Sequence, residues 1–71
     1  METKCYMVVE LVGGTLDWLS AYKKKSEAEK WAEEFARIAK AELVDYNEDV
    51  VRWLTKDGKT EVILTQSWYN S

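Results

Sequence analysis

Seventy-one residues are enough to bury one hydrophobic core, so the sequence predicts a single domain spanning residues 1–71. One cysteine and no histidine exclude an internal disulfide, a zinc cluster and the usual histidine-based catalysis. A net charge of −3 argues against a broad phosphate-binding face, because nucleic-acid-binding domains usually carry a basic surplus. The composition therefore favours a non-enzymatic protein with no cofactor and no bound metal.

The sequence also favours a cytoplasmic location. The lone thiol of Cys5 fits a reducing compartment, since secreted chains of this size usually carry paired cysteines. Residues 1–5 lack the basic start and apolar run of a signal peptide, and no apolar stretch approaches the roughly 20 residues of a membrane span. We therefore expect no membrane partner.

The first third of the chain has the pattern of a β-hairpin. A strand over residues 4–12 ends at a Gly-Gly pair, which is typical of a two-residue turn, and residues 16–23 return as the second strand. This register sets Glu10 opposite Asp17. Because like charges directly opposite each other are unfavourable, a longer loop remains an alternative.

Residues 26–41 have the pattern of an amphipathic helix that ends within residues 41–43. Ser26, with Glu29 three residues on, predicts a capping box at the start of the helix. Glu33 and Arg37 have the spacing and order of a stabilising ion pair. Apolar residues recur at spacings of three and four and predict the packed face: Ala28, Trp31, Ala32, Phe35, Ile38 and Ala39.

An acidic segment, residues 42–49, is predicted to be an irregular connection. After it the sequence supports two interpretations of residues 47–55. They begin a strand, or Asn47 caps a short second helix that ends before Gly58.

The strand interpretation gives a second hairpin. Residues 50–55 and 60–65 are rich in β-branched and aromatic side chains, and Asp57-Gly58 between them is typical of a type I′ turn. The turn would pair Trp53 with Val62 across the two strands.

These elements predict an α+β domain with two layers in the order β-β-α-β-β, in which one helix packs on a four-stranded antiparallel sheet. The expected core combines side chains from the helix and the C-terminal half of the chain: Trp31, Phe35, Trp53, Leu64 and Trp68.

The other face of the predicted sheet is too apolar for water. Its side chains are Tyr6, Val8, Val12, Leu19, Ala21, Val50, Leu54 and Ile63. Two interpretations remain open. The face or an edge of the sheet forms a homodimer, or the tail at Trp68-Tyr69 folds back over it. The sequence leaves open which face is buried.

The acidic segment begins like a calcium loop, but Val50 stands where the motif requires glycine and Lys56 where a bidentate glutamate belongs. Clustered carboxylates beside aromatic side chains instead predict a patch that engages a basic groove on another protein or ribonucleoprotein. A solvated loop without a partner is the alternative. The predicted partner-binding residues are Asp45, Tyr46, Glu48, Asp49 and Tyr69.

A basic run provides an alternative site for nucleic acid. Lysine side chains would contact phosphates while a neighbouring tyrosine stacks on a base. The residues of this alternative are Tyr22, Lys23, Lys24 and Lys25. Three lysines at a junction between strand and helix are also typical of a solvated corner, and the acidic remainder of the chain makes direct nucleic-acid binding the less favoured interpretation.

Residues 21–34, which run from a strand into a capped helix, resemble the arm-type DNA-binding domains of phage integrases. Those domains are basic, whereas the matching face here is apolar and acidic. In size, acidity, aromatic richness and lack of catalytic residues, the chain is more similar to phage-encoded anti-defence proteins such as the anti-CRISPR inhibitors. This resemblance implies an inhibitor that blocks a nucleic-acid-binding surface of a host defence complex with acidic and aromatic side chains.

Overall fold

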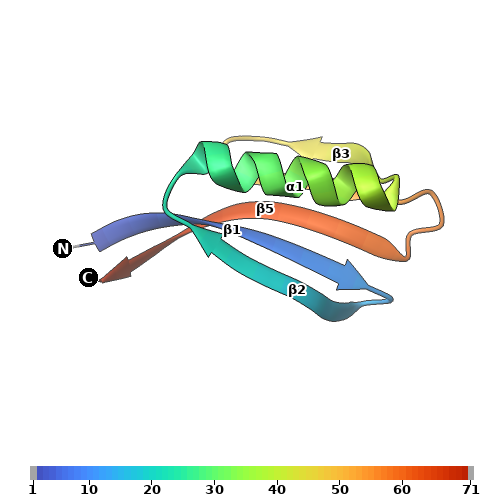
Figure 1. Cartoon of the computed structure of the whole chain (residues 1–71), viewed down its shortest axis with the longest axis horizontal. Coiled ribbons are helices and arrows are strands. Elements are labelled where there is room, and N and C mark those ends of the chain that lie inside the picture. Colours follow the sequence, from blue (N-terminus) through green and yellow to red (C-terminus); the bar gives the residue numbers. More distant parts are fainter. Residues whose placement is uncertain (1, 71) are drawn as a thin grey trace.

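The computed structural model describes residues 2–70, and the side chains of residues 4–68. The elements in chain order are β1 (Glu2–Val12), β2 (Thr15–Tyr22), α1 (Lys25–Ala39), β3 (Glu42–Tyr46), β4 (Val50–Leu54) and β5 (Thr60–Asn70). All strand pairs are antiparallel, the strand order is β2-β1-β5-β4-β3, and α1 lies across one face of the sheet (Figure 1). The α+β class is confirmed, but the sheet has five strands rather than four.

The additional strand is β3, which occupies the acidic segment that was predicted to be irregular. Leu43, Val44 and Tyr46 favour extended backbone, and pairing with β4 satisfies backbone groups along one side of the strand. The carboxylates that suggested a loop fit an edge strand, where charged side chains protect an unpaired edge. The same pairing makes β4 a strand, so the interpretation of residues 47–55 as a helix is wrong.

The first hairpin has the predicted two-residue turn. Gly13 and Gly14 both have positive φ, as a type I′ turn requires. A β-bulge next to Asp17 then shifts the register, so that Glu10 lies opposite Trp18 and not opposite Asp17. The bulge changes the register, but the Glu10 and Asp17 carboxyl groups stay close enough to share a hydrogen bond.

The second hairpin has the predicted strand register and a different turn. Trp53 lies opposite Val62, as expected. Of the two turn residues only Gly58 has positive φ, so the type I′ prediction is wrong. The Asp57 carboxylate accepts hydrogen bonds from Thr55 Oγ1 at 2.6 Å and from the Lys59 backbone N–H at 3.0 Å, and these bonds stabilise a longer loop.

The N-cap of the helix lies two residues earlier than predicted, and the capping box is absent. Its N-cap is Lys24, no side chain caps the first turn, and Ser26 already lies inside the helix. Arg37 forms its ion pair with Glu34 and not with Glu33. The helix ends at Ala39, and Lys40 closes it in the left-handed conformation.

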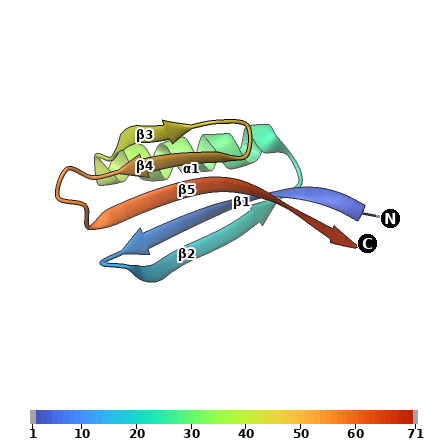
Figure 2. The same ribbon diagram turned by 180° about the vertical axis from the view of Figure 1, so that it is seen from behind.

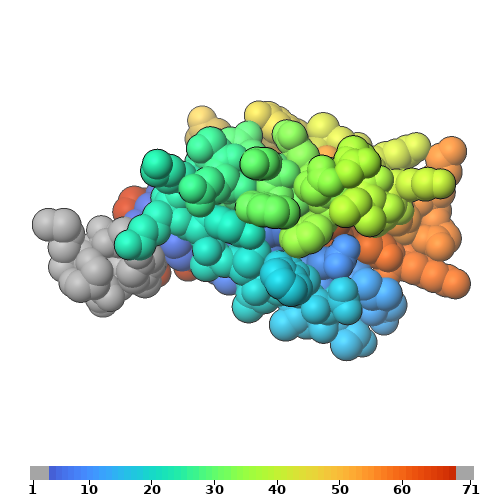
Figure 3. Space-filling model, viewed as in Figure 1, coloured from blue at the N-terminus to red at the C-terminus, as the bar shows by residue number. Residues whose placement is uncertain are grey.

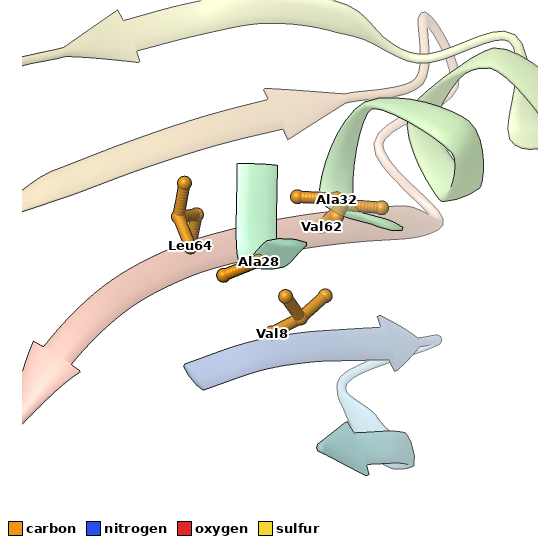
Figure 4. Close-up of a cluster of buried hydrophobic side chains, with 5 residues drawn as sticks. All are labelled: Val8, Ala28, Ala32, Val62 and Leu64. Carbon is orange, nitrogen blue, oxygen red and sulfur yellow. The ribbon is translucent and has the colours of Figure 1, made fainter. Parts of the chain in front are cut away.

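The core lies between α1 and the central strands. Its buried side chains are Val8, Ala28, Ala32, Ala36, Val62 and Leu64, five of which are drawn in Figure 4. Alanines allow the helix backbone to lie close to the sheet, so the larger helix side chains project past it. Phe35 and Trp53 pack against the core as expected, whereas Trp31 is 43% exposed and Trp68 60% exposed, so both were wrongly assigned to it.

The strand pairing also shows which side chains share each face of the sheet. Tyr6, Val8 and Val12 lie on the helix side, contrary to their predicted grouping with Leu19 and Ile63, which lie on the opposite side. β5 stays paired with β1 through Trp68, so this segment does not fold back over the side away from the helix. Figure 3 shows the helix side, with the β1–β2 hairpin extending beyond the helix.

Glu10 gives the fold a predicted pH dependence. Burial first, and then a hydrogen bond and charge repulsion from Asp17, raise the pKa of the Glu10 carboxyl. The Glu10 carboxyl has a higher pKa in the folded protein than in the unfolded chain. Its contribution to stability is therefore fully present below the pKa of the unfolded chain and is lost as pH rises through the pKa of the folded protein. Glu10→Gln is therefore expected to raise the melting temperature near pH 7 and to leave it unchanged below about pH 4.

Thermal unfolding followed by circular dichroism measures this difference. Glu34→Gln is the control, because the hydrogen bond from Arg37 lowers the pKa of Glu34 and gives its contribution the opposite sign. Equal melting temperatures for Glu10→Gln and the unmodified protein near pH 7 would contradict the assignment.

Candidate functional site

The turn between β3 and β4 is built around Asn47. Its side-chain oxygen accepts hydrogen bonds from the backbone N–H groups of Asp49 at 2.8 Å and Val50 at 2.9 Å. The Asn47 backbone N–H donates to the Val50 carbonyl at 3.0 Å. These bonds fix the turn and present its side chains at the end of the molecule where α1 begins (Figure 1).

The structure divides the predicted acidic site. Tyr46 lies opposite Val51 on the helix side and is 76% exposed, and Glu48 is exposed at the turn. Asp45 lies opposite Arg52 on the other side of the sheet and accepts a hydrogen bond from its guanidinium at 2.7 Å. Asp49 accepts a hydrogen bond from the Gln66 amide at 2.7 Å. Tyr46 and Glu48 are therefore available together, whereas Asp45 and Asp49 have partners within the fold.

The remaining predicted contact, Tyr69, lies in β5 by its backbone. Its side chain is outside the described residues.

A groove separates α1 from the β3–β4 hairpin. It exists because α1 makes its closest backbone approaches to β1 and β5 and leaves the helix side of β3 and β4 uncovered. The groove has a volume of about 250 Å³. Val51, Trp53 and Leu64 form its apolar floor, and Leu43 and Tyr46 form one wall.

The opposite wall is acidic. Glu29 and Glu33, one turn apart on α1, both line the groove, and no basic residue is among the described residues that line it. Sequence reasoning assigned these carboxylates to a capping box and an ion pair, neither of which forms. Their spacing of four residues on one helix face was the signal that could have identified them.

The groove continues into a narrow hollow of about 30 Å³ at the β3–β4 turn. Glu29, Tyr46, Val51 and Leu64 line both spaces. Lys25 lines the hollow together with Glu48 and Asp49, among others. The two sites that the sequence suggested separately, the acidic segment and the lysine run, therefore meet at one end of the molecule.

The alternative basic site is larger in the structure than in the sequence analysis. Lys23, Lys24 and Lys25 are exposed, and Tyr22 is half-buried opposite Tyr6. Across the sheet, Lys4 Nζ lies 5.7 Å from the ring centroid of Tyr6 and 5.5 Å from that of Trp68. Sequence reasoning missed Lys4 and Trp68, because only the pairing of β1 with β5 brings them together.

The groove combines an apolar floor, aromatic side chains and two carboxylates, a set that suits recognition of an aliphatic side chain with a cationic end. Among the described residues, no three histidine, cysteine or acidic side chains are grouped so that they could hold a metal ion.

No helix in the described part of the chain is long and apolar enough to cross a membrane. Comparison with protein-family models, curated proteins and solved structures gives no match to this chain.

Proposed function

We propose that this protein is a non-enzymatic binding module that receives a basic, partly apolar segment of a partner protein in the groove between α1 and β3–β4. The observation that carries the proposal is the pairing of Glu29 and Glu33 with an open apolar floor that includes Trp53. Two carboxylates beside an uncovered apolar surface are complementary to lysine or arginine, whose long stems are apolar and whose ends are charged.

The size of the groove supports one or two side chains as ligand. Its volume of about 250 Å³ is below the range of about 300–1,000 Å³ typical of pockets for drug-sized molecules. Tyr46 extends the site because its ring is exposed beside the carboxylates, where it can contact a cation or the aliphatic stem of a partner side chain.

Such a module acts by occupying a surface and requires no chemical step. Nucleic-acid-binding surfaces are rich in lysine and arginine, because these side chains neutralise phosphates. A protein that holds one of these side chains in an acidic groove competes directly with nucleic acid. This is the mode of action that the resemblance to anti-CRISPR inhibitors implies, and it is the form in which we propose the function.

Selection of binders from a random peptide library, with the purified protein as bait, tests the proposal. We expect enriched peptides to contain lysine or arginine next to apolar residues. The double variant Glu29→Gln/Glu33→Gln is expected to weaken binding of the enriched peptides at least about 10-fold, because each carboxylate supplies a charge-assisted contact.

A matched control removes the same charge elsewhere. Glu27→Gln/Glu34→Gln neutralises two carboxylates of α1 that do not line the groove and is expected to bind the peptides as the unmodified protein does. Enrichment of acidic peptides, or equal binding by the two double variants, would contradict the proposal.

A second candidate function rests on the cluster of Lys4, Tyr6 and Trp68 on strands β1 and β5. Lys4 lies over the rings of Tyr6 and Trp68, and three consecutive lysines follow the nearby strand β2. Aromatic rings beside cations are the usual elements of single-stranded nucleic-acid binding. A gel-shift assay with a single-stranded oligonucleotide, comparing Trp68→Ala with the unmodified protein, tests this alternative.

A further inference from the structure

The side of the sheet away from α1 is an uncovered apolar surface, which we call the open face. Figure 2 shows the sheet from this side, with no element of residues 2–70 in front of it. Strand pairing places these apolar side chains on it: Cys5, Met7, Val9, Leu11, Leu16, Leu19, Ala21, Val50, Leu54 and Ile63. Leu16 and Leu19 are each more than half exposed.

The charges on the open face are confined to one half, where three of them pair with one another and Glu42 lies opposite Leu54. Arg52 donates hydrogen bonds to Glu61 at 2.6 Å and to Asp45 at 2.7 Å, and these lie on the β3–β4–β5 half. On β1 and β2, cross-strand pairs such as Val9 with Leu19 and Met7 with Ala21 place only uncharged side chains on this face. A strongly charged partner would find no counter-charge on that half.

The core on the helix side is small for a chain of this length. Three of its six buried side chains are alanines, and Val8 and Val62 are the largest that are fully buried among the described residues. Domains of this size have little stability to spare, and many small proteins gain more from a disulfide, a metal or a second subunit. The sequence has one cysteine and no histidine, so of these three sources the second subunit is the one that the open face can supply.

We propose that two copies of this protein pack through their open faces. A two-fold axis that is parallel to the face and perpendicular to the strands places each strand over the equivalent strand of the second copy. The apolar β1–β2 halves of the two copies then meet each other. The same axis keeps the ion-paired clusters of Asp45, Arg52 and Glu61 together on one half of the interface and away from its apolar half. The result is an antiparallel β-sandwich with a dry centre around Val9 and Ile63.

The available area is large enough for a specific dimer interface of small size. Five strands about 4.8 Å apart span about 24 Å, and about six residues along a strand span about 20 Å. The open face therefore has an outline on the order of 500 Å² per copy. Two copies therefore bury on the order of 1,000 Å² even before side-chain relief is counted, which reaches the lower limit of specific interfaces. This outline is also on the order of a tenth of the 5088 Å² accessible surface of the chain, a usual share for a small protein in a complex.

The dimer is independent of the proposed ligand of the groove. The groove lies on the helix side, so this assembly leaves both grooves exposed on opposite outer surfaces. If each groove binds a partner, the dimer is bivalent.

Sedimentation equilibrium over a range of concentrations tests the proposal. We expect a mass of twice 8.3 kDa for the unmodified protein. Leu19→Glu places a charge in the apolar half of the interface and is expected to raise the dimer dissociation constant about 100-fold or more. Because Leu19 is exposed in the single chain, the variant is expected to keep the circular dichroism spectrum of the fold.

The control is Ile38→Glu, which makes the same kind of change at a 66% exposed position on α1, in the other layer. It is expected to dimerise as the unmodified protein does. A monomeric mass for the unmodified protein at all concentrations would overturn the proposal, and so would an unchanged dissociation constant for Leu19→Glu. Slowed amide exchange on dimerisation that is confined to the outer, unpaired N–H groups of the edge strand β2 would also overturn it, since that result indicates pairing through the edge.

Discussion

Replacing Trp53 with alanine is expected to lower the free energy of unfolding by about 3 kcal/mol, near the lower end of the range for truncating a packed aromatic side chain. Trp53 lies on β4 opposite Val62 on β5 and Leu43 on β3, and it packs against the core cluster. Because so few large side chains are buried on the helix side, the loss of one indole removes a large share of the apolar contact. Equilibrium unfolding in urea measures the effect.

The same substitution at Trp68 is the matched control. Trp68 is 60% exposed, and Lys4 Nζ lies over its ring at 5.5 Å from the ring centroid. An exposed cation–π contact is worth about 0.5–1 kcal/mol, so Trp68→Ala is expected to cost no more than that. Equal losses of stability at the two positions would contradict the packing of Trp53.

Replacing Ala32 with leucine is expected to destabilise the protein by about 2 kcal/mol, the usual cost of overpacking a close-packed core. Ala32 is completely buried in the middle of α1, where the helix lies against Val8 and Val62. Three added carbon atoms force the helix away from the sheet or force strained side-chain conformations. The free energy of unfolding in urea is again the measurement.

Lys30→Leu is the control for Ala32→Leu, since it introduces the same side chain at an exposed position of the same helix. A surface substitution of this kind is expected to change stability by less than about 0.5 kcal/mol. If Ala32→Leu were as stable as Lys30→Leu, the close approach of α1 to the sheet would be wrong.

Much of the fold was predictable because its signals are local. The Gly13-Gly14 turn follows from the positive φ that only glycine adopts readily, and the pairing of Trp53 with Val62 follows from two β-rich segments around Asp57-Gly58. The helix was recognised from its apolar periodicity.

The features that were missed depend on tertiary packing. β3 becomes a strand because β4 provides a partner, although its sequence is acidic. The packed stripe of the helix is set by Ala28, Ala32 and Ala36, because the sheet admits only small side chains at the closest approach. Hydrophobicity alone favoured Trp31 and Ile38, which project past the sheet.

The candidate site was predictable only in part for the same reason. Tyr46 and Glu48 belong to one short segment, and their exposure follows from the turn. Glu29 and Glu33 reach the site from another element, and only the packing of α1 on the sheet creates the groove between them and Trp53. Asp45 points to the side of the sheet opposite Leu43 and Tyr46, because a register shift between Leu43 and Asp45 interrupts the regular alternation along β3.

The most direct test of the binding account uses the four tryptophans as probes, because Trp53 is the one that lines the groove. A basic peptide from the library selection is titrated into ¹⁵N-labelled protein, and the indole N–H signals are followed by NMR. The account predicts that the Trp53 indole signal shifts with the peptide concentration, while the signals of Trp18, Trp31 and Trp68 change little. A shift at Trp68 with an unchanged Trp53 signal would contradict it and would move the binding site to the Lys4–Trp68 cluster.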